Sequence, residues 1–168
     1  MVIVIMGVAG SGKTTIGQAL AAALHWPFRD ADEFHPPENI AKMAAGAPLN
    51  DDDRAPWLAA IHDYIDEILA AGKSAVVTCS ALKESYRQIL RGSHPANRDA
   101  FDAVQWVYLK GDPALLLKRL EMRRGHFMKP EMLQSQLATL EEPRGAIIED
   151  TARSPQEIVA HIRGTLGV

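Results

Sequence analysis

The chain has 168 residues, of which 47% are hydrophobic and 23% are charged, and its formal net charge is −3. These values are typical of a globular protein with one core, so we expect one domain over residues 1–168. The slightly negative net charge argues against nucleic acid as a partner. No apolar run approaches the roughly 20 residues of a membrane span. Cys79 is the only cysteine, which excludes an internal disulfide, and the first residues lack the positive segment of a signal peptide, so we expect a cytoplasmic protein.

Apolar runs and helical periodicities alternate along the chain. Short, continuous apolar runs predict buried strands over residues 2–6, 27–29, 74–78, 104–109 and 146–149. Apolar residues at helical spacing predict helices over residues 13–24, 36–45, 57–71, 83–91, 113–120 and 155–166. Residues 46–56 are rich in turn formers and are expected to form a loop. This alternation predicts an α/β fold of three layers, in which a parallel sheet of about five strands carries helices on both faces.

The segment GVAGSGKTT, residues 7–15, lies between the first expected strand and the first expected helix. It matches the phosphate-binding pattern G-x-x-x-x-G-K-[ST] at every fixed position, in the strand-to-helix context that this pattern requires. Lys13 is expected to reach the β- and γ-phosphates of a nucleotide, and the Thr14 hydroxyl to bind Mg²⁺. Backbone N–H groups of the loop and of the helix N-terminus surround the phosphates in such a P-loop. The expected phosphate-binding residues are Gly7, Ala9, Gly10, Ser11, Gly12, Lys13, Thr14 and Thr15.

Two aspartates follow the second expected strand. If the strand continues through Asp30 and Asp32, their side chains point to the same face, at the carboxyl edge of the sheet beside the P-loop. A carboxylate there can orient or deprotonate an alcohol, so Asp32 is the candidate base, and Asp30 is a candidate metal ligand acting through water. The pattern alone leaves open a solvated acidic turn. We expect His35 to hydrogen-bond a substrate, because no second His or Cys stands at metal-ligand spacing.

Several further stretches resemble one family, the gluconate kinases or gluconokinases of the P-loop small-kinase class. They are DADEFHPPENIAKMAAGAPLNDDDRAPWL, CSALKESYRQILR, VYLKG and RGHFMKPEMLQSQLATLEEP, and with the P-loop they span residues 7 to about 143. The resemblance implies the fold of shikimate and nucleoside monophosphate kinases. It also implies transfer of the γ-phosphate of ATP to the 6-hydroxyl of D-gluconate, with Mg²⁺, giving 6-phosphogluconate. Because members of this family often form dimers, it further implies a homodimer.

The resemblance also implies which residues bind the substrate. Gluconate is a small anion with many hydroxyls, so its carboxylate needs a cationic clamp and its hydroxyls need polar partners. The implied contacts are Asp32, His35, Arg54, Ser80, Lys83, Arg87 and His126. For Arg54 the alternative is an ion pair with the neighbouring aspartates, and for Lys83 and Arg87 it is a solvated helix face. Cys79 is interpreted as a buried residue at a strand end rather than as a nucleophile.

Residues 123–142 are charged, rich in methionine and less regular, and we interpret them as a helical lid over the site rather than as a second domain. Arg119, Arg123 and Arg124 lie where related kinases carry lid arginines. Arg119 and Arg123 are four residues apart and share a helix face. The resemblance implies that they bind the γ-phosphate, stabilise charge in the transition state and exclude water. An exposed basic helix end is the alternative.

Two other functions stay open from the sequence. One is a P-loop kinase of another small hydroxy acid, such as shikimate or a different aldonate, because the polarity of such pockets differs little. The other is a non-catalytic regulator that binds ATP without turnover. The paired aspartates, the cationic clamp and the lid arginines argue against a regulator, because a sensor has no need of an acceptor site.

Overall fold

The computed structural model describes residues 1–92, 103–122 and 130–168. Its strands are β1 (Val2–Met6), β2 (Phe28–Asp30), β3 (Ala75–Thr78), β4 (Val104–Lys110) and β5 (Ile147–Asp150). They form one parallel sheet in the order β2-β3-β1-β4-β5. The expected α/β fold with a five-stranded parallel sheet is therefore confirmed. β1 lies at the centre with all five residues buried, which explains its unbroken apolar sequence.

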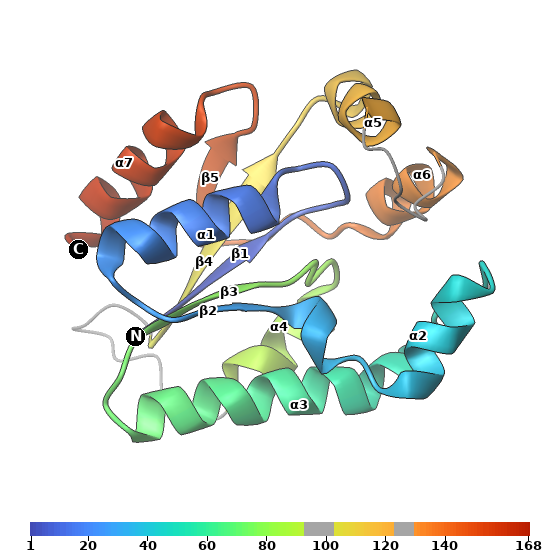
Figure 1. Ribbon diagram of the computed structural model, residues 1–168, viewed down its shortest axis with the longest axis horizontal. Coiled ribbons are helices and arrows are strands. Elements are labelled where there is room, and N and C mark those ends of the chain that lie inside the picture. Colours follow the sequence, from blue (N-terminus) through green and yellow to red (C-terminus); the bar gives the residue numbers. More distant parts are fainter. Residues whose placement is uncertain (93–102, 123–129) are drawn as a thin grey trace.

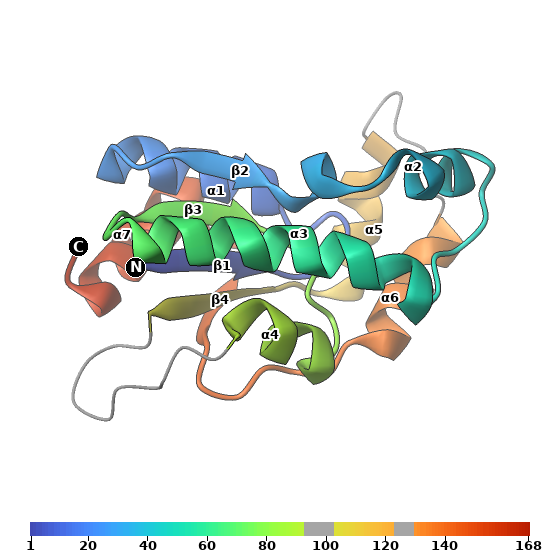
Figure 2. The ribbon, with the colours of Figure 1, turned by 90° about the horizontal axis from the view of Figure 1, so that it is seen from below.

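Helices cover both faces of this sheet. They are α1 (Lys13–Leu24), the 3-10 helix η1 (Ala31–Phe34), α2 (Pro37–Ala44), α3 (Asp51–Ala70), α4 (Glu84–Arg91), α5 (Pro113–Met122), α6 (Pro130–Thr139) and α7 (Pro155–Leu166). Figure 1 shows α1 and α7 on one face and α3 and α4 on the other. Figure 2 shows α3 running along its face, with α2, α5 and α6 gathered at the end of the sheet where the strands stop. No described helix is both long and apolar enough to cross a membrane.

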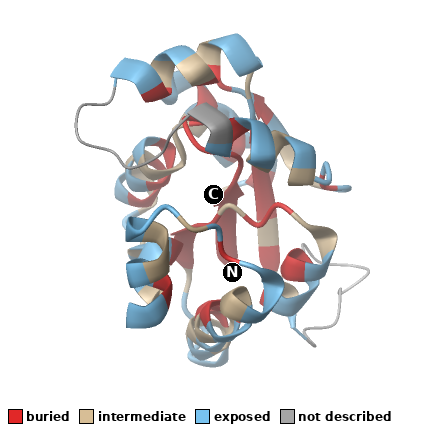
Figure 3. Cartoon of the chain, turned by 90° about the vertical axis from the view of Figure 1, so that its right-hand side faces the viewer, coloured by how far each residue is buried: buried red, intermediate tan, exposed pale blue. Residues whose placement is uncertain are grey.

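The core divides into two layers because successive strand residues point to opposite faces. Val2, Val4 and Met6 of β1 face α3 and α4 and pack with Trp57, Ile61, Ile65 and Leu90. Ile3 and Ile5 face the other way and pack with Leu20, Ile158 and Ile162 of α1 and α7. In Figure 3, which looks onto the carboxyl edge of the sheet, the buried strands lie between helices whose outer faces are exposed. All parallel strands therefore deliver their following loops to this one edge.

One local expectation is corrected. Residues 46–56 are not a loop throughout, because α3 already begins at Asp51, after Asn50 as its N-cap. The Asn50 side chain accepts from the Asp53 N–H at 2.8 Å while the Asp53 carboxylate accepts from the Asn50 N–H at 2.8 Å. Asn and Asp are turn formers, yet they are equally the residues that begin helices. In the segment 123–142, expected to be helical, the part described from residue 130 is mainly the helix α6.

Gly17 sets how closely α1 approaches the sheet. A Cβ built at this glycine would lie 2.7 Å from Phe28 Cε2 in β2 and 2.7 Å from Thr78 Cγ2 in β3. Real Cβ atoms do not approach other atoms so closely, so any larger residue must displace α1 or the side chains of Phe28 and Thr78. Because α1 carries the P-loop at its N-terminus, the same contact holds the P-loop against the sheet edge.

Gly17→Ala is expected to lower the free energy of unfolding by about 1–3 kcal/mol, because the added methyl group overpacks this contact. Gly164 of α7 is the matched control, since no described atom lies within 4 Å of a Cβ built there. Gly164→Ala should raise the free energy of unfolding by up to ~1 kcal/mol through its better helix propensity. Urea unfolding followed by circular dichroism measures both. Equal effects of the two substitutions would contradict the close packing at Gly17.

Candidate active site

The P-loop follows β1 and surrounds the N-terminus of α1. Gly12 is the N-cap of α1 with φ of 90°, and among the described residues no side chain caps this helix and no acidic residue stands in its first turn. By contrast, α3 and α7 each begin with a capping box. Gly10 has φ of 78°, and a Cβ there would lie 2.9 Å from the Leu116 carbonyl oxygen. The first N–H groups of α1 are therefore left for an anion, and the glycines are required by the conformation of the loop.

Polar side chains of the P-loop face inward. Lys13 Nζ donates to the Val8 carbonyl at 3.1 Å, so its ammonium group lies over the loop. Ser11 is 2% exposed, and its hydroxyl has no hydrogen-bond partner among the described residues. Thr15, by contrast, is exposed on α1. A buried hydroxyl and an ammonium group beside uncapped N–H groups fit the phosphates of a nucleotide.

Thr14 and Asp30 meet beside the P-loop. Thr14 Oγ1 donates to Asp30 Oδ2 at 2.9 Å, which joins the first turn of α1 to the end of β2. Within the described part of the chain, no three His, Cys, Asp or Glu side chains gather as a metal site. Hard oxygen ligands such as this hydroxyl and this carboxylate suit Mg²⁺, which commonly takes its other ligands from phosphates and water. The pair therefore fits an ion shared with a bound nucleotide.

The strand does not continue through Asp30 to Asp32, so the expectation that both project from one strand face is wrong. β2 ends at Asp30, which becomes the N-cap of η1, and its Oδ1 accepts from the Asp32 N–H at 3.2 Å. The side chain of Glu33 completes a capping box. This Asp-x-x-Glu spacing of Asp30 and Glu33 favours a helix N-terminus over continuation of the strand. Asp32 is instead exposed in the first turn of η1, still at the carboxyl edge of the sheet.

His35 lies between η1 and α3. Its ring stacks on Trp57 with ring centroids 4.5 Å apart and an interplanar angle of 7°, and Trp57 Nε1 donates to the Ala31 carbonyl at 2.7 Å. Burial lowers the pKa of His35, an effect that the nearby Asp32 opposes and Arg54 reinforces. Burial therefore favours the neutral form of the imidazole, which can both donate and accept a hydrogen bond. The stacking on Trp57 holds the ring in one orientation. Trp57 belongs to the core and is 3% exposed.

Four side chains of α3 and α4 and of the turn before α4 form a charged group, which we call the Asp51 cluster: Asp51, Arg54, Lys83 and Tyr86. Lys83 Nζ lies 2.9 and 2.7 Å from the two Asp51 carboxylate oxygens. Tyr86 Oη donates to Asp51 at 2.5 Å, and Arg54 Nη1 lies 3.7 Å from it. Hydrogen bonding to Asp51 raises the pKa of Lys83, while the hydrogen bonds from Lys83 and Tyr86 lower the pKa of Asp51. The two cations and the phenol thus converge on one carboxylate.

A cleft of about 480 Å³ opens over the Asp51 cluster. Its walls come from the start of α3, the turn after β3, and α6. The lining residues are Pro48, Leu49, Asn50, Asp51, Asp52, Arg54, Ser80, Leu82, Lys83, Tyr86, Ser135, Gln136 and Thr139. The structure therefore brings three of the expected substrate residues together here, namely Arg54, Ser80 and Lys83. Lys83 is not on a solvated helix face as the alternative had it, since its ammonium group is bonded to Asp51.

Arg87 supports the turn after β3 from beneath. It is 1% exposed, so the alternative of a solvated helix face is wrong for this residue. Its Nη1 donates to the Ala81 carbonyl at 2.8 Å and to the Leu82 carbonyl at 3.3 Å, and its Nε donates to Glu84 at 2.8 Å. Ala81 has φ of 43°, a strained conformation for a residue other than glycine. Arg87 therefore fixes a strained turn that carries Ser80 and Lys83; its direct contact with a substrate stays a prediction.

The turn after β3 begins with Cys79, which is 2% exposed. Burial raises the pKa of its thiol to about 12, so the thiolate form is negligible at neutral pH. This agrees with the interpretation of Cys79 as a structural residue.

The expected lid residues are described only in part. Arg119 Nη2 donates to the Thr151 carbonyl at 2.7 Å, which ties α5 to the loop after β5. Arg123, Arg124 and His126 lie outside the described residues, so their predicted roles at the γ-phosphate and the substrate stay predictions. α6 provides residues that the sequence analysis missed: Ser135, Gln136 and Thr139. Their spacing in the stretch SQLAT, with Ser135 and Thr139 four residues apart and therefore on the same side of the helix, is the signal that could have found them.

Comparison with known proteins agrees with this geometry. Residues 9–166 match the shikimate kinase family. The chain is 49% identical over 141 residues to a gluconokinase of Gluconobacter oxydans (strain 621H), covering 84% of this chain and 75% of the relative. It is 45% identical over 175 aligned positions to a probable gluconokinase of Xenopus tropicalis, covering 98% and 92% of the two chains.

Solved structures of P-loop kinases share the fold of this chain. The crystal structure of a gluconokinase from Sinorhizobium meliloti 1021 superposes with a TM-score of 0.84 at 47% identity, covering 98% of this chain and 90% of the other. Shikimate kinase from Aquifex aeolicus superposes with a TM-score of 0.59 at 18% identity, covering 99% and 96% of the two chains, and this shows the fold alone. The P-loop, the cleft beside it and these similarities together show that the chain belongs to the gluconokinase family of P-loop kinases.

Proposed function

We propose that this protein is an ATP-dependent gluconokinase that transfers the γ-phosphate to the 6-hydroxyl of D-gluconate, giving 6-phospho-D-gluconate and ADP. One observation carries the proposal: a polar cleft with two cationic side chains shares Gln136 with the P-loop, whose Ala9 N–H donates to that side chain. A P-loop alone would suit a switch, a motor or a kinase. An adjoining site for a small polar anion is what a small-molecule kinase requires.

The Asp51 cluster suits the carboxylate of the acceptor. Arg54 and Lys83 supply donors for a carboxylate, and Tyr86 and Ser80 supply hydroxyl groups for the polyol chain. The Asp51 carboxylate already accepts from Lys83 and Tyr86 and faces Arg54. An entering gluconate would share or take over those hydrogen bonds, so Asp51 keeps the cations ordered before substrate arrives. His35, neutral and fixed on Trp57, supplies a further hydrogen-bonding group.

The donor half of the site is the P-loop. Lys13 and the first N–H groups of α1 would hold the β- and γ-phosphates. Thr14 and Asp30 would hold Mg²⁺, Asp30 through water, and the ion when bound would neutralise charge on the phosphates. Asp32 would accept the proton of the 6-hydroxyl as that oxygen attacks the γ-phosphorus. Arg119 and Arg123 would stabilise the charge that develops on the transferred phosphoryl group, with His126 closing over the substrate.

Two further expectations remain predictions. The homodimer rests on the family resemblance, and the cytoplasmic location rests on the composition of the sequence. Phosphorylation of another small acid is the second candidate function, because the chain also matches the shikimate kinase family. The relatives that are 42–49% identical are gluconokinases or probable gluconokinases, whereas the shikimate kinase structure is 18% identical, which favours gluconate.

The choice of acceptor is tested by incubating the protein with Mg-ATP and a panel of acids that includes gluconate, other aldonates and shikimate, with ADP release as the readout. We expect ADP release that depends on gluconate and far exceeds that with shikimate. Faster ADP release with a different acid would show that this acid, and not gluconate, is the preferred acceptor. ATP binding without acid-dependent ADP from any panel member would support a regulator and overturn the kinase proposal.

Asp32→Asn is expected to lower kcat by about 10²–10⁴-fold, the usual contribution of a general base, while ATP affinity stays near that of the unchanged protein. Steady-state rates and nucleotide titration measure the two effects. Asp63→Asn, at an exposed position of α3, is the control and should keep full activity. Weakened ATP binding with normal turnover at saturating ATP would contradict the assignment of Asp32 as the base.

Lys83→Met is expected to raise the KM for gluconate about 10- to 100-fold, which corresponds to loss of one charged hydrogen bond of about 1.5–3 kcal/mol. The KM for ATP should stay unchanged, because Lys83 lies in the cleft rather than in the P-loop. Lys73→Met, at an exposed position before β3, is the control. An unchanged KM for gluconate, or an equal rise in the KM values for gluconate and ATP, would contradict the assignment of Lys83 to the binding of the gluconate carboxylate.

A further inference from the structure

We propose that Gln136 of α6 is a positioning residue that holds the P-loop in register with the acceptor cleft. This inference rests on the proposed transfer between the two sites and adds to it a residue that sets their relative geometry. Gln136 contacts the P-loop directly and also lines the cleft. It is therefore a single side chain that belongs to both halves of the site.

The contact is a hydrogen bond across the site. The N–H of Ala9 in the P-loop donates to Gln136 Oε1 at 2.7 Å, between residues 127 positions apart in the chain. A backbone N–H can only donate, so the carbonyl oxygen of the Gln136 amide must face the loop, which fixes the orientation of the side chain. Figure 1 shows α6 beside the loop that joins β1 to α1, and Figure 2 shows the same proximity from below.

An apolar cluster supports this bond. Leu133, Leu137 and Leu140 of α6 and its C-terminal end pack with Val8 and Ala9 of the P-loop and with residues of α5 and of the turn after β3: Leu82, Leu116 and Leu120. Leu133 is 3% exposed and Val8 is 3% exposed. The hydrogen bond thus lies at the border of a packed core, where it competes less with water than a surface bond does.

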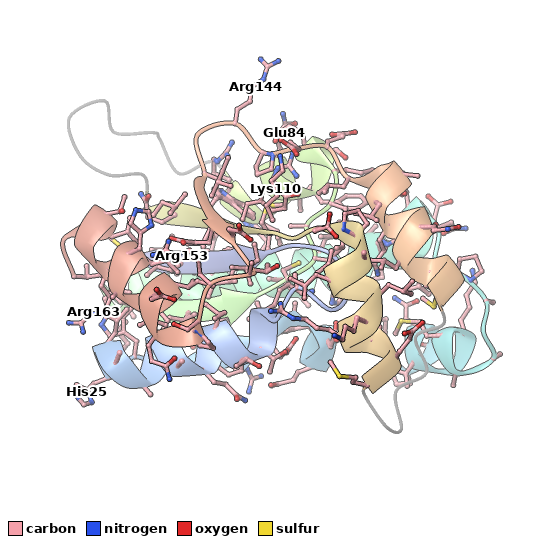
Figure 4. All side chains as sticks on the ribbon, turned by 90° about the horizontal axis from the view of Figure 1, so that it is seen from above. His25, Glu84, Lys110, Arg144, Arg153 and Arg163 are labelled. Atoms are coloured by element: carbon pink, nitrogen blue, oxygen red, sulfur yellow. The ribbon has the colours of Figure 1, made fainter. Side chains whose placement is uncertain are left out.

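The other end of α6 is fastened to the acceptor side. Directly after the helix, the Glu141 N–H donates to the Leu82 carbonyl at 2.8 Å. The Glu141 carboxylate accepts from the Glu84 N–H at the start of α4, at 2.6 Å. Figure 4 labels Glu84 beside the segment that leads away from α6. The described part of the expected lid is therefore a wall bonded to the P-loop at one point and to the acceptor turn at another.

This arrangement matters because phosphoryl transfer depends on in-line placement of the attacking oxygen and the γ-phosphate. A misplacement of about 1 Å can cost on the order of 10²-fold in rate. The hydrogen bond from Ala9 holds the P-loop against the helix whose Ser135 and Thr139 line the acceptor cleft. Loss of the bond should let donor and acceptor shift relative to each other while each still binds.

The test replaces Gln136 by methionine, which keeps the length of the side chain but lacks the amide oxygen. We expect Gln136→Met to lower kcat about 10- to 100-fold while KM for ATP and for gluconate each change less than about threefold. Gln134→Met is the matched control, because Gln134 stands two residues earlier on α6 and is exposed; it should leave all three constants unchanged. Thermal unfolding of each variant shows whether α6 still packs.

The inference is overturned if Gln136→Met keeps kcat within twofold, or if its loss lies wholly in a KM value. All rates are compared with the unchanged protein on the acid that it phosphorylates fastest, so an acceptor other than gluconate would refute the proposed substrate without affecting this test.

Discussion

The buried position of β1 at the centre of the parallel sheet determines where the chemistry can occur. All five residues of β1 are buried, with β3 on one side and β4 on the other, so the P-loop leaves the sheet at the middle of its carboxyl edge. β3 delivers the turn with Ser80 and Lys83 to the same edge, and β2 delivers Asp30. The contact of Gly17 with β2 and β3 keeps α1 and its uncapped N-terminus close to these groups. The residues proposed to bind donor and acceptor thus meet because of strand order rather than proximity in sequence.

Electrostatics then distinguishes the two halves of the site. In the P-loop, positive charge comes from Lys13 and from the first N–H groups of α1, which no described side chain caps, and we expect both to bind phosphates. In the cleft, the cations are already paired, since Lys83 and Arg54 face Asp51. An anion that enters this site must compete with the Asp51 carboxylate for the same cations and is repelled by it. The site therefore favours an acceptor with a single negative charge over a more highly charged anion. This fits gluconate better than a phosphorylated sugar acid.

Much of this arrangement could be predicted from the sequence, and the exceptions have physical reasons. The burial of residues 2–6, the P-loop and the order of strands and helices follow from local apolar patterns and from the phosphate-binding motif. The start of α3 at Asp51 and the helical turn at Asp32 do not follow from such patterns, because Asp and Asn serve both in turns and in helix caps. The contact between Gln136 and Ala9, and the support of the turn by Arg87, depend on tertiary packing. No local pattern predicts a bond between residues 127 positions apart.

In the proposed mechanism both substrates occupy adjoining sites at the same time, and the phosphate passes directly between them. Initial rates measured against gluconate at several fixed concentrations of Mg-ATP distinguish this mechanism from a two-step transfer. We expect double-reciprocal lines that intersect, because enzyme, ATP and gluconate then form a ternary complex. Parallel lines, with formation of a phosphorylated enzyme in the absence of gluconate, would contradict it, because the phosphate would then pass through the protein instead.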